Sequence, residues 1–266
     1  MANLSPFTPA GDAFVLRMRG RILTFTILAT SGVAWLTLWR WGTSPAARYG
    51  HEHIHFAAQT QTGLLLAFAA GWTLMLLAMM LPTSLPLLAL FSRLTRERRD
   101  HWTLVGLVVA GYVAIWLLFG IAAYLATDPL LRALQLEHWM HLHARWLAAG
   151  TVMFAGVYQF TPLKYRCLEK CRSPFSFIAE HWTGRGETRQ ALWLGAHHGL
   201  FCVGCCWSLM LLMFTIGAGS VAWMLLLGAL MAIEKNSPWG KPFARALGLG
   251  LLLAGVGISA GFWPVQ

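Results

Sequence analysis

The chain has 266 residues, of which 57% are apolar and 11% are charged. Soluble domains typically carry about 25% charged residues, so this composition excludes a water-soluble globule. It predicts an all-α, polytopic bundle of transmembrane helices in a lipid bilayer. The formal net charge is +10, but most Lys and Arg residues lie on one side of the predicted spans. The charge therefore reports membrane topology and does not indicate a nucleic-acid partner.

Apolar runs predict about seven spans, or six if one of the two short runs does not cross the membrane. The spans cover approximately residues 21–39, 63–91, 102–126, 146–163, 191–216, 219–234 and 245–263. The positive-inside rule places the N-terminus in the cytoplasm. The first run is longer than a signal-peptide core, so we expect a retained helix. We expect residues 1–266 to form a single integral-membrane domain.

The second predicted span carries Pro82 and Pro86 together with three methionines, Met75, Met79 and Met80. Each proline removes a backbone hydrogen bond and kinks the helix, and the freed carbonyl groups need partners inside the bundle. Met75 and Met79 lie one turn apart on one face. These methionines can hold a soft cation, although core packing is the more usual explanation for such residues.

The fifth predicted span concentrates sulfur and imidazole side chains on one face. At 100° per residue, six of them fall within an arc of about 140°: His198, Cys202, Cys205, Cys206, Met210 and Met213. Thiolate and thioether are soft ligands that suit Cu(I), and a Cys/His set would hold Zn²⁺ nearly as well. The pattern predicts a metal site. The Gly195-x-x-x-Gly199 and Gly257-x-x-x-Gly261 patterns allow close approach of helices.

Two further groups of potential ligands lie in predicted loops. The outer loops hold six histidines: His51, His53, His55, His138, His141 and His143. Since imidazole is a common metal ligand, these loops are candidates for collecting a metal. Cys167 and Cys171 lie in a predicted cytoplasmic loop among four cations, Lys164, Arg166, Lys170 and Arg172, which would favour the thiolate form.

Four motifs resemble those of the DUF2182 family of predicted metal-binding integral membrane proteins, over about residues 70–236. They are Met79–Pro82, Gly156–Lys164 with the Cys167 and Cys171–Pro174 segment, Cys202–Met210 with its Cys-x-Gly-Cys-Cys-Trp core, and Glu234-Lys235. This family includes a membrane protein thought to deliver copper to a bacterial tyrosinase. The resemblance implies copper handling in a bacterial inner membrane, with a periplasmic cuproenzyme or metallochaperone as partner.

The leading hypothesis is a membrane protein that acquires Cu(I), or delivers it to a cuproenzyme, through intramembrane Cys, Met and His ligands. No Ser-His-Asp arrangement, P-loop or dinucleotide motif is visible, so an enzyme is not expected. Three alternatives stay open: a metal permease, a thiol-redox protein that uses the vicinal Cys205 and Cys206 or the Cys202-x-x-Cys205 pair, and an assembly subunit whose cysteines only pack.

Overall fold

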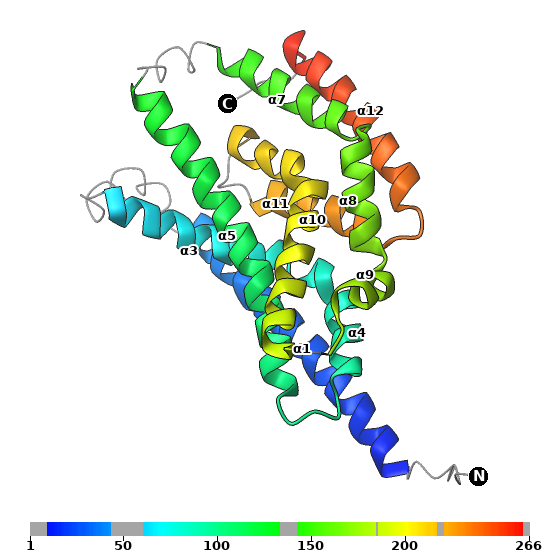
Figure 1. Cartoon of the computed structure of the whole chain (residues 1–266). Coiled ribbons are helices and arrows are strands. Elements are labelled where there is room, and N and C mark those ends of the chain that lie inside the picture. The colour runs from blue at the N-terminus through cyan, green and yellow to red at the C-terminus, as the bar shows by residue number, and fades with distance from the viewer. Residues whose placement is uncertain (1–9, 44–60, 134–142, 185, 217–220, 263–266) are drawn as a thin grey trace.

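The computed structural model describes residues 10–43, 61–133, 143–184, 186–216 and 221–262. These residues form ten α-helices, one 3₁₀ helix and no strand, so the all-α class is confirmed (Figure 1). In chain order the elements are α1 (Ala10–Thr43), α3 (Gln61–Met79), η1 (Pro82–Ser84), α4 (Leu85–Leu94), α5 (His101–Ala133), α7 (Ala144–Tyr158), α8 (Pro162–Arg172), α9 (Pro174–His181), α10 (Glu187–Ile216), α11 (Val221–Asn236) and α12 (Gly240–Ser259).

Five of the described helices are long and apolar enough to cross a membrane, which is consistent with an integral membrane protein. The spans are Arg21–Trp41, Thr62–Met79, His101–Ala126, Glu187–Met213 and Gly240–Ser259. Helices α7 and α11 have only 15 and 16 residues. At 1.5 Å per residue they reach about 22 and 24 Å, less than the ~30 Å hydrocarbon core. The expected seven spans are thus not confirmed by the described residues.

The second predicted span is not one kinked helix, and the prediction of a continuous span over 63–91 is wrong. Helix α3 ends at Met79, a 3₁₀ turn follows, and α4 begins at Leu85. The reason is local: Pro82 has no N–H to donate to the carbonyl of Ala78, four residues earlier.

The carbonyl groups freed at this break find partners inside the bundle, as predicted. The Ala78 carbonyl accepts hydrogen bonds from Ser31 Oγ at 2.8 Å and from Trp35 Nε1 at 3.1 Å, both on α1. The Met80 carbonyl accepts one from Thr83 Oγ1 at 2.8 Å. The break is therefore stabilised by tertiary contacts, and it turns the Met80–Thr83 segment toward the centre of the molecule.

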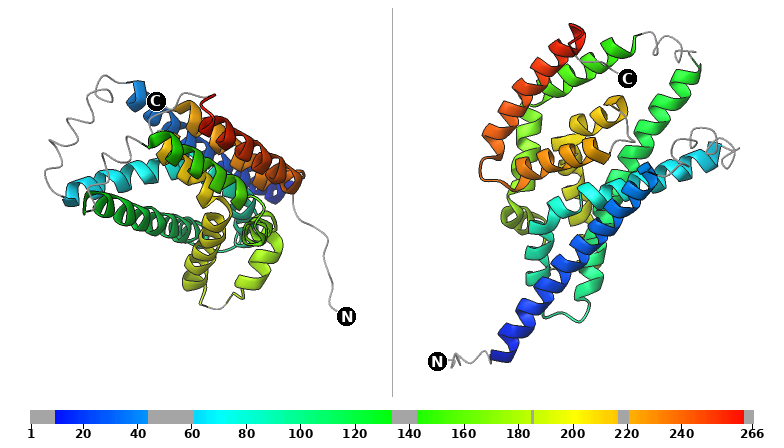
Figure 2. Two further views of the ribbon diagram at one scale, coloured as in Figure 1. Left: turned by 90° about the horizontal axis from the view of Figure 1, so that it is seen from above. Right: turned by 180° about the vertical axis from the view of Figure 1, so that it is seen from behind.

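Helices α5 and α10 form the most extensive contact between described helices, and glycines allow it. A Cβ atom at Gly111 would lie 2.2 Å from the carbonyl oxygen of Leu192, and one at Gly195 would lie 2.0 Å from that of Val108. The close approach predicted from Gly195 is confirmed. Both views in Figure 2 show α12 lying along α7.

The second small-residue pattern does not act as predicted. Gly261 lies beyond the last residue of α12 with a φ of +83°, so it is not part of a helix face. The contact between α7 and α12 instead uses Gly248 and Gly255, where a Cβ atom would lie 2.7 Å from Phe160 and 2.3 Å from Met153.

We expect Gly111→Ala to destabilise the protein by about 1–3 kcal/mol, because the added methyl group has no space between α5 and α10. Gly106→Ala on the same helix is the matched control, since a Cβ atom there meets nothing within 4 Å. The control should be neutral or stabilising by up to about 1 kcal/mol. Thermal unfolding in detergent measures both, and equal midpoints for the two variants would contradict the packing described.

Candidate metal centre

Three cysteines on α10 face the interior at the middle of the helix. Cys202, Cys205 and Cys206 are each only 1% exposed. The thiols of Cys205 and Cys206 donate to the backbone carbonyl of Cys202 at 3.2 and 2.8 Å. All three thus lie on one buried face of α10, as its sequence period predicts.

A second pair of cysteines reaches this face from α8, which corrects the prediction of a loop for residues 164–172. Pro162 occupies the first turn of α8, and the Thr161 side chain caps it by accepting from the backbone N–H of Lys164 at 3.3 Å. These are standard signals for the start of a helix. The helix packs against α10 and buries Cys167 and Leu168.

The packing of α8 brings thiols of the two helices together. The Sγ atoms of Cys171 and Cys205 lie 3.9 Å apart. Metal–thiolate bonds of ~2.3 Å, as for zinc, allow two sulfurs on one ion to be at most ~4.6 Å apart. One ion can therefore bridge this pair. Cys167 also lies close, because a Cβ atom at Gly204 would be 2.6 Å from its Sγ atom. The glycine in the Cys-x-Gly-Cys-Cys motif therefore makes room for the Cys167 side chain of α8.

The thiols are not arranged as a finished three-ligand site. In the part of the chain that the structure describes, no three His, Cys, Asp or Glu side chains are grouped to hold one ion. All five cysteines are free. A two-coordinate ion between α8 and α10 is the arrangement closest to the observed positions.

Lys235 at the end of α11 places a cation among these sulfurs. Its Nζ atom lies 3.0 Å from Cys202 Sγ, 3.7 Å from Met80 Sδ and 3.3 Å from Thr83 Oγ1. The hydroxyl group of Tyr112 is also hydrogen-bonded to Cys202 Sγ, at 3.0 Å. Lys235 is 7% exposed, and within the described residues it forms no ion pair.

The neighbouring Glu234 pairs with Lys164 of α8 and not with Lys235. Its carboxylate accepts from Lys164 Nζ at 2.8 and 3.0 Å, and both side chains are fully buried. Consecutive residues on a helix point about 100° apart. Glu234 therefore faces α8 while Lys235 faces the cysteines. Arg172 Nη1 also donates to the Glu234 carbonyl at 2.7 Å.

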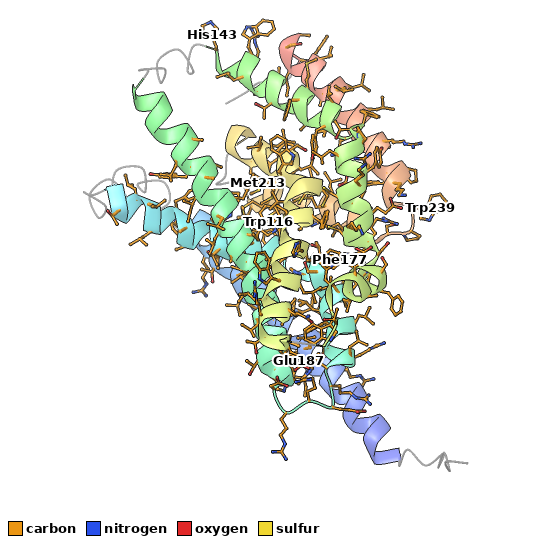
Figure 3. All side chains as sticks on the ribbon, viewed as in Figure 1. Trp116, His143, Phe177, Glu187, Met213 and Trp239 are labelled. Atoms are coloured by element: carbon orange, nitrogen blue, oxygen red, sulfur yellow. The ribbon has the colours of Figure 1, made fainter. Side chains whose placement is uncertain are left out.

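The remaining predicted ligands of α3 and α10 are buried around this cluster. Five methionines belong to the same core as the cysteines: Met75, Met79, Met80, Met210 and Met213. Figure 3 labels Met213 beside Trp116 in this region. His198 is 5% exposed, and its ring stacks on Tyr112 with centroids 5.6 Å apart. Its Nδ1 atom has no hydrogen-bond partner among the described groups.

Of the six outer histidines, only His143 lies within the described residues. His51, His53, His55, His138 and His141 lie outside the described residues. His143 precedes α7 at the far end of the molecule from the start of α10 (Figure 3).

The electrostatic setting of the α8 cysteines differs from the prediction. Burial raises the pKa of the Cys167 thiol. The hydrogen bond with Cys205, together with burial, raises the pKa of Cys171 well above its ordinary value. The expectation that basic neighbours favour thiolate here is therefore wrong, because burial of Cys167 and the hydrogen bond of Cys171 with Cys205 favour the protonated thiols. Any metal that binds them must displace protons.

The fold and the site together are those of a helical protein of the membrane type with a buried group of thiols. The PpoB2 copper-chaperone family model matches residues 69–258. The chain therefore belongs to this copper-chaperone family, as its resemblance to DUF2182 proteins indicated. No curated protein matches the chain, and no solved structure does.

Sequence reasoning missed the two groups that contact Cys202. Nothing in the apolar sequence around Tyr112 indicates a contact with a cysteine. Lys235 does carry a signal, because an ionisable residue at the end of an apolar helix indicates a functional site by default.

We expect Lys164→Met to destabilise the protein by about 3–5 kcal/mol, because it leaves the Glu234 carboxylate buried without a partner. The double variant Lys164→Met/Glu234→Gln should recover most of this loss. Lys241→Met breaks the exposed pair with Glu169 and should cost less than about 1 kcal/mol. The midpoint of thermal unfolding in detergent is measured for each variant. A midpoint of the double variant that is no higher than that of Lys164→Met would contradict the pairing.

Proposed function

We propose that the protein binds Cu(I) between α8 and α10 and hands it to a cuproenzyme or metallochaperone outside the inner membrane. The observation that carries this proposal is the 3.9 Å separation of the Cys171 and Cys205 sulfurs, in a group of five free cysteines of which four are buried. Two soft sulfurs at bridging distance suit Cu(I).

The charge of the cluster favours a monovalent ion. Cu(I) on two thiolates carries one net negative charge, which the Lys235 ammonium compensates at 3.0 Å from Cys202. A divalent ion such as Zn²⁺ on the same two thiolates is neutral, and with Lys235 the group carries a net positive charge. Uncompensated charge is costly in a buried site, so Lys235 supports Cu(I) over Zn²⁺.

Transfer to a partner proceeds by exchange of thiolate ligands. Cys171 is the one cysteine of the five that is only partly buried, which makes it the ligand that an incoming partner can replace first. Cys202, Cys205 and Cys206 are closed off from the surface and retain the ion until then.

We expect the triple variant Cys202→Ser/Cys205→Ser/Cys206→Ser to lose tight Cu(I) binding, and Cys171→Ser alone to weaken it at least tenfold. Met153→Leu, at the contact of α7 with α12, is the control that should bind as wild type does. Bound copper is measured by mass spectrometry after anaerobic purification with reductant. Unchanged copper stoichiometry in the triple variant would refute the proposal, and thermal midpoints check that each variant is folded.

Lys235→Met should lower the Cu(I) affinity at least tenfold and change the Zn²⁺ affinity less, because only the Cu(I) complex needs the positive charge. Lys235→Arg keeps the charge and should recover part of the Cu(I) affinity. Lys241→Met, an exposed lysine of α12, is the matched control. Competition titrations with chromophoric chelators give the ratio of the two affinities, and a ratio that Lys235→Met leaves unaltered would contradict the charge argument.

Two other functions use the same cysteines. A permease must show uptake of copper into proteoliposomes, whereas a chaperone binds and transfers without flux. A thiol-redox protein would cycle Cys171 and Cys205 between dithiol and disulfide, which alkylation and intact mass after mild oxidation would detect.

A further inference from the structure

We propose that His181 and His197 form a second, weaker Cu(I) site near the N-terminal end of α10, and that this site exchanges copper with the cysteine cluster. The inference rests on the proposed function for the identity of the ion. The location, ligands and chemistry of the second site are independent of the cysteines.

The two imidazole rings meet at a pocket between α9 and α10. His181 is the last residue of α9 and His197 lies on the third turn of α10. Their ring centroids are 4.9 Å apart, with the ring planes tilted by 46°. Both rings line a pocket of about 430 Å³ that also includes Arg189, Gln190 and Trp193. Neither histidine is fully buried, so an ion can reach them from the surface of the protein.

The hydrogen bonds of both histidines leave the same nitrogen available. Nδ1 of His181 lies 2.9 Å from the carbonyl oxygen of Phe177, and Nδ1 of His197 lies 2.9 Å from that of Trp193. A carbonyl oxygen only accepts, so each Nδ1 carries a proton, and in the neutral ring the Nε2 lone pair is then the one that can bind a metal. Metal-binding histidines show this pattern, in which a backbone carbonyl holds the ring and sets its tautomer.

His198 connects this pocket to the sulfur cluster. His181 stacks on Phe177 with centroids 4.5 Å apart, and Phe177 contacts the His198 ring at 5.7 Å. On its other side His198 stacks on Tyr112, whose hydroxyl group reaches Cys202. The unpartnered Nδ1 atom of His198 is buried along this route. A buried polar atom without a partner is costly. A Cu(I) ion that moves between the histidine pocket and the cysteines would supply a partner for this nitrogen.

The pocket favours a monovalent soft ion. Imidazole binds copper as well as zinc and nickel. The Arg189 guanidinium lines the same pocket, and by Coulomb's law it repels a divalent ion twice as strongly as a monovalent one. Cu(I) therefore suits two neutral imidazoles beside an arginine better than Zn²⁺ does.

The test is an anaerobic Cu(I) titration of the reduced full-length protein in detergent, against a chromophoric Cu(I) chelator. Wild type should bind one tight and one weaker equivalent. The double variant His181→Gln/His197→Gln should bind the weaker equivalent with an affinity at least tenfold lower than that of wild type. Its affinity for the tight equivalent should be unchanged. Met153→Leu, at the contact of α7 with α12, is the control and should retain both. A weaker equivalent that the double variant retains, or that wild type lacks, would overturn the second site.

A second readout separates this inference from the proposed function. X-ray absorption at the copper edge should show imidazole scattering in the wild type loaded with two equivalents and a loss of it in His181→Gln, which alters one partly exposed side chain. If wild type lacks the tight equivalent but keeps the imidazole-bound one, the cysteine proposal fails while the histidine site stands. Zn²⁺ binding at the pocket as tight as that of Cu(I) would overturn the assignment of the ion.

Discussion

The buried ion pair between Lys164 and Glu234 joins the two short helices on which the proposed metal centre depends. Neither α8 nor α11 is long enough to be anchored by spanning the membrane. The pair joins them inside the bundle, and Arg172 adds a second link to the Glu234 carbonyl. Because one partner alone would be a buried charge, the two helices are constrained to meet. Their meeting sets Cys171 against Cys205 and turns Lys235 toward Cys202.

Helix α10 connects the parts of this arrangement. Glycines at its contact with α5 allow the two backbones to approach closely, so α10 is held firmly along its length. One stretch of α10 carries the thiols, within the core that includes the methionines. The stretch nearer Glu187 borders a separate core and the histidine pocket. A single rigid helix thus presents sulfur at one level and imidazole at another.

A lysine among thiols also explains how such a cluster can be stable before a metal binds. In the described structure, Lys235 donates to sulfur and hydroxyl groups, while no carboxylate competes for it. The cluster therefore has a positive charge available and, among the described residues, no carboxylate beside Lys235. Both features suit the Cu(I) ion that we propose as its cargo, and the family match is to copper chaperones.

Local sequence patterns determined much of this protein. Composition predicted apolar helices, the period of residues 198–213 predicted one buried sulfur-rich face, and Pro82 predicted the loss of a backbone hydrogen bond. Each of these depends only on neighbours in the chain. Only the tertiary structure decided that α3 ends, that α8 is a packed helix, and that Glu234 pairs with Lys164 instead of Lys235. Those outcomes depend on how helices distant in sequence are oriented when they pack against one another. The spacing of residues within one segment does not determine that orientation.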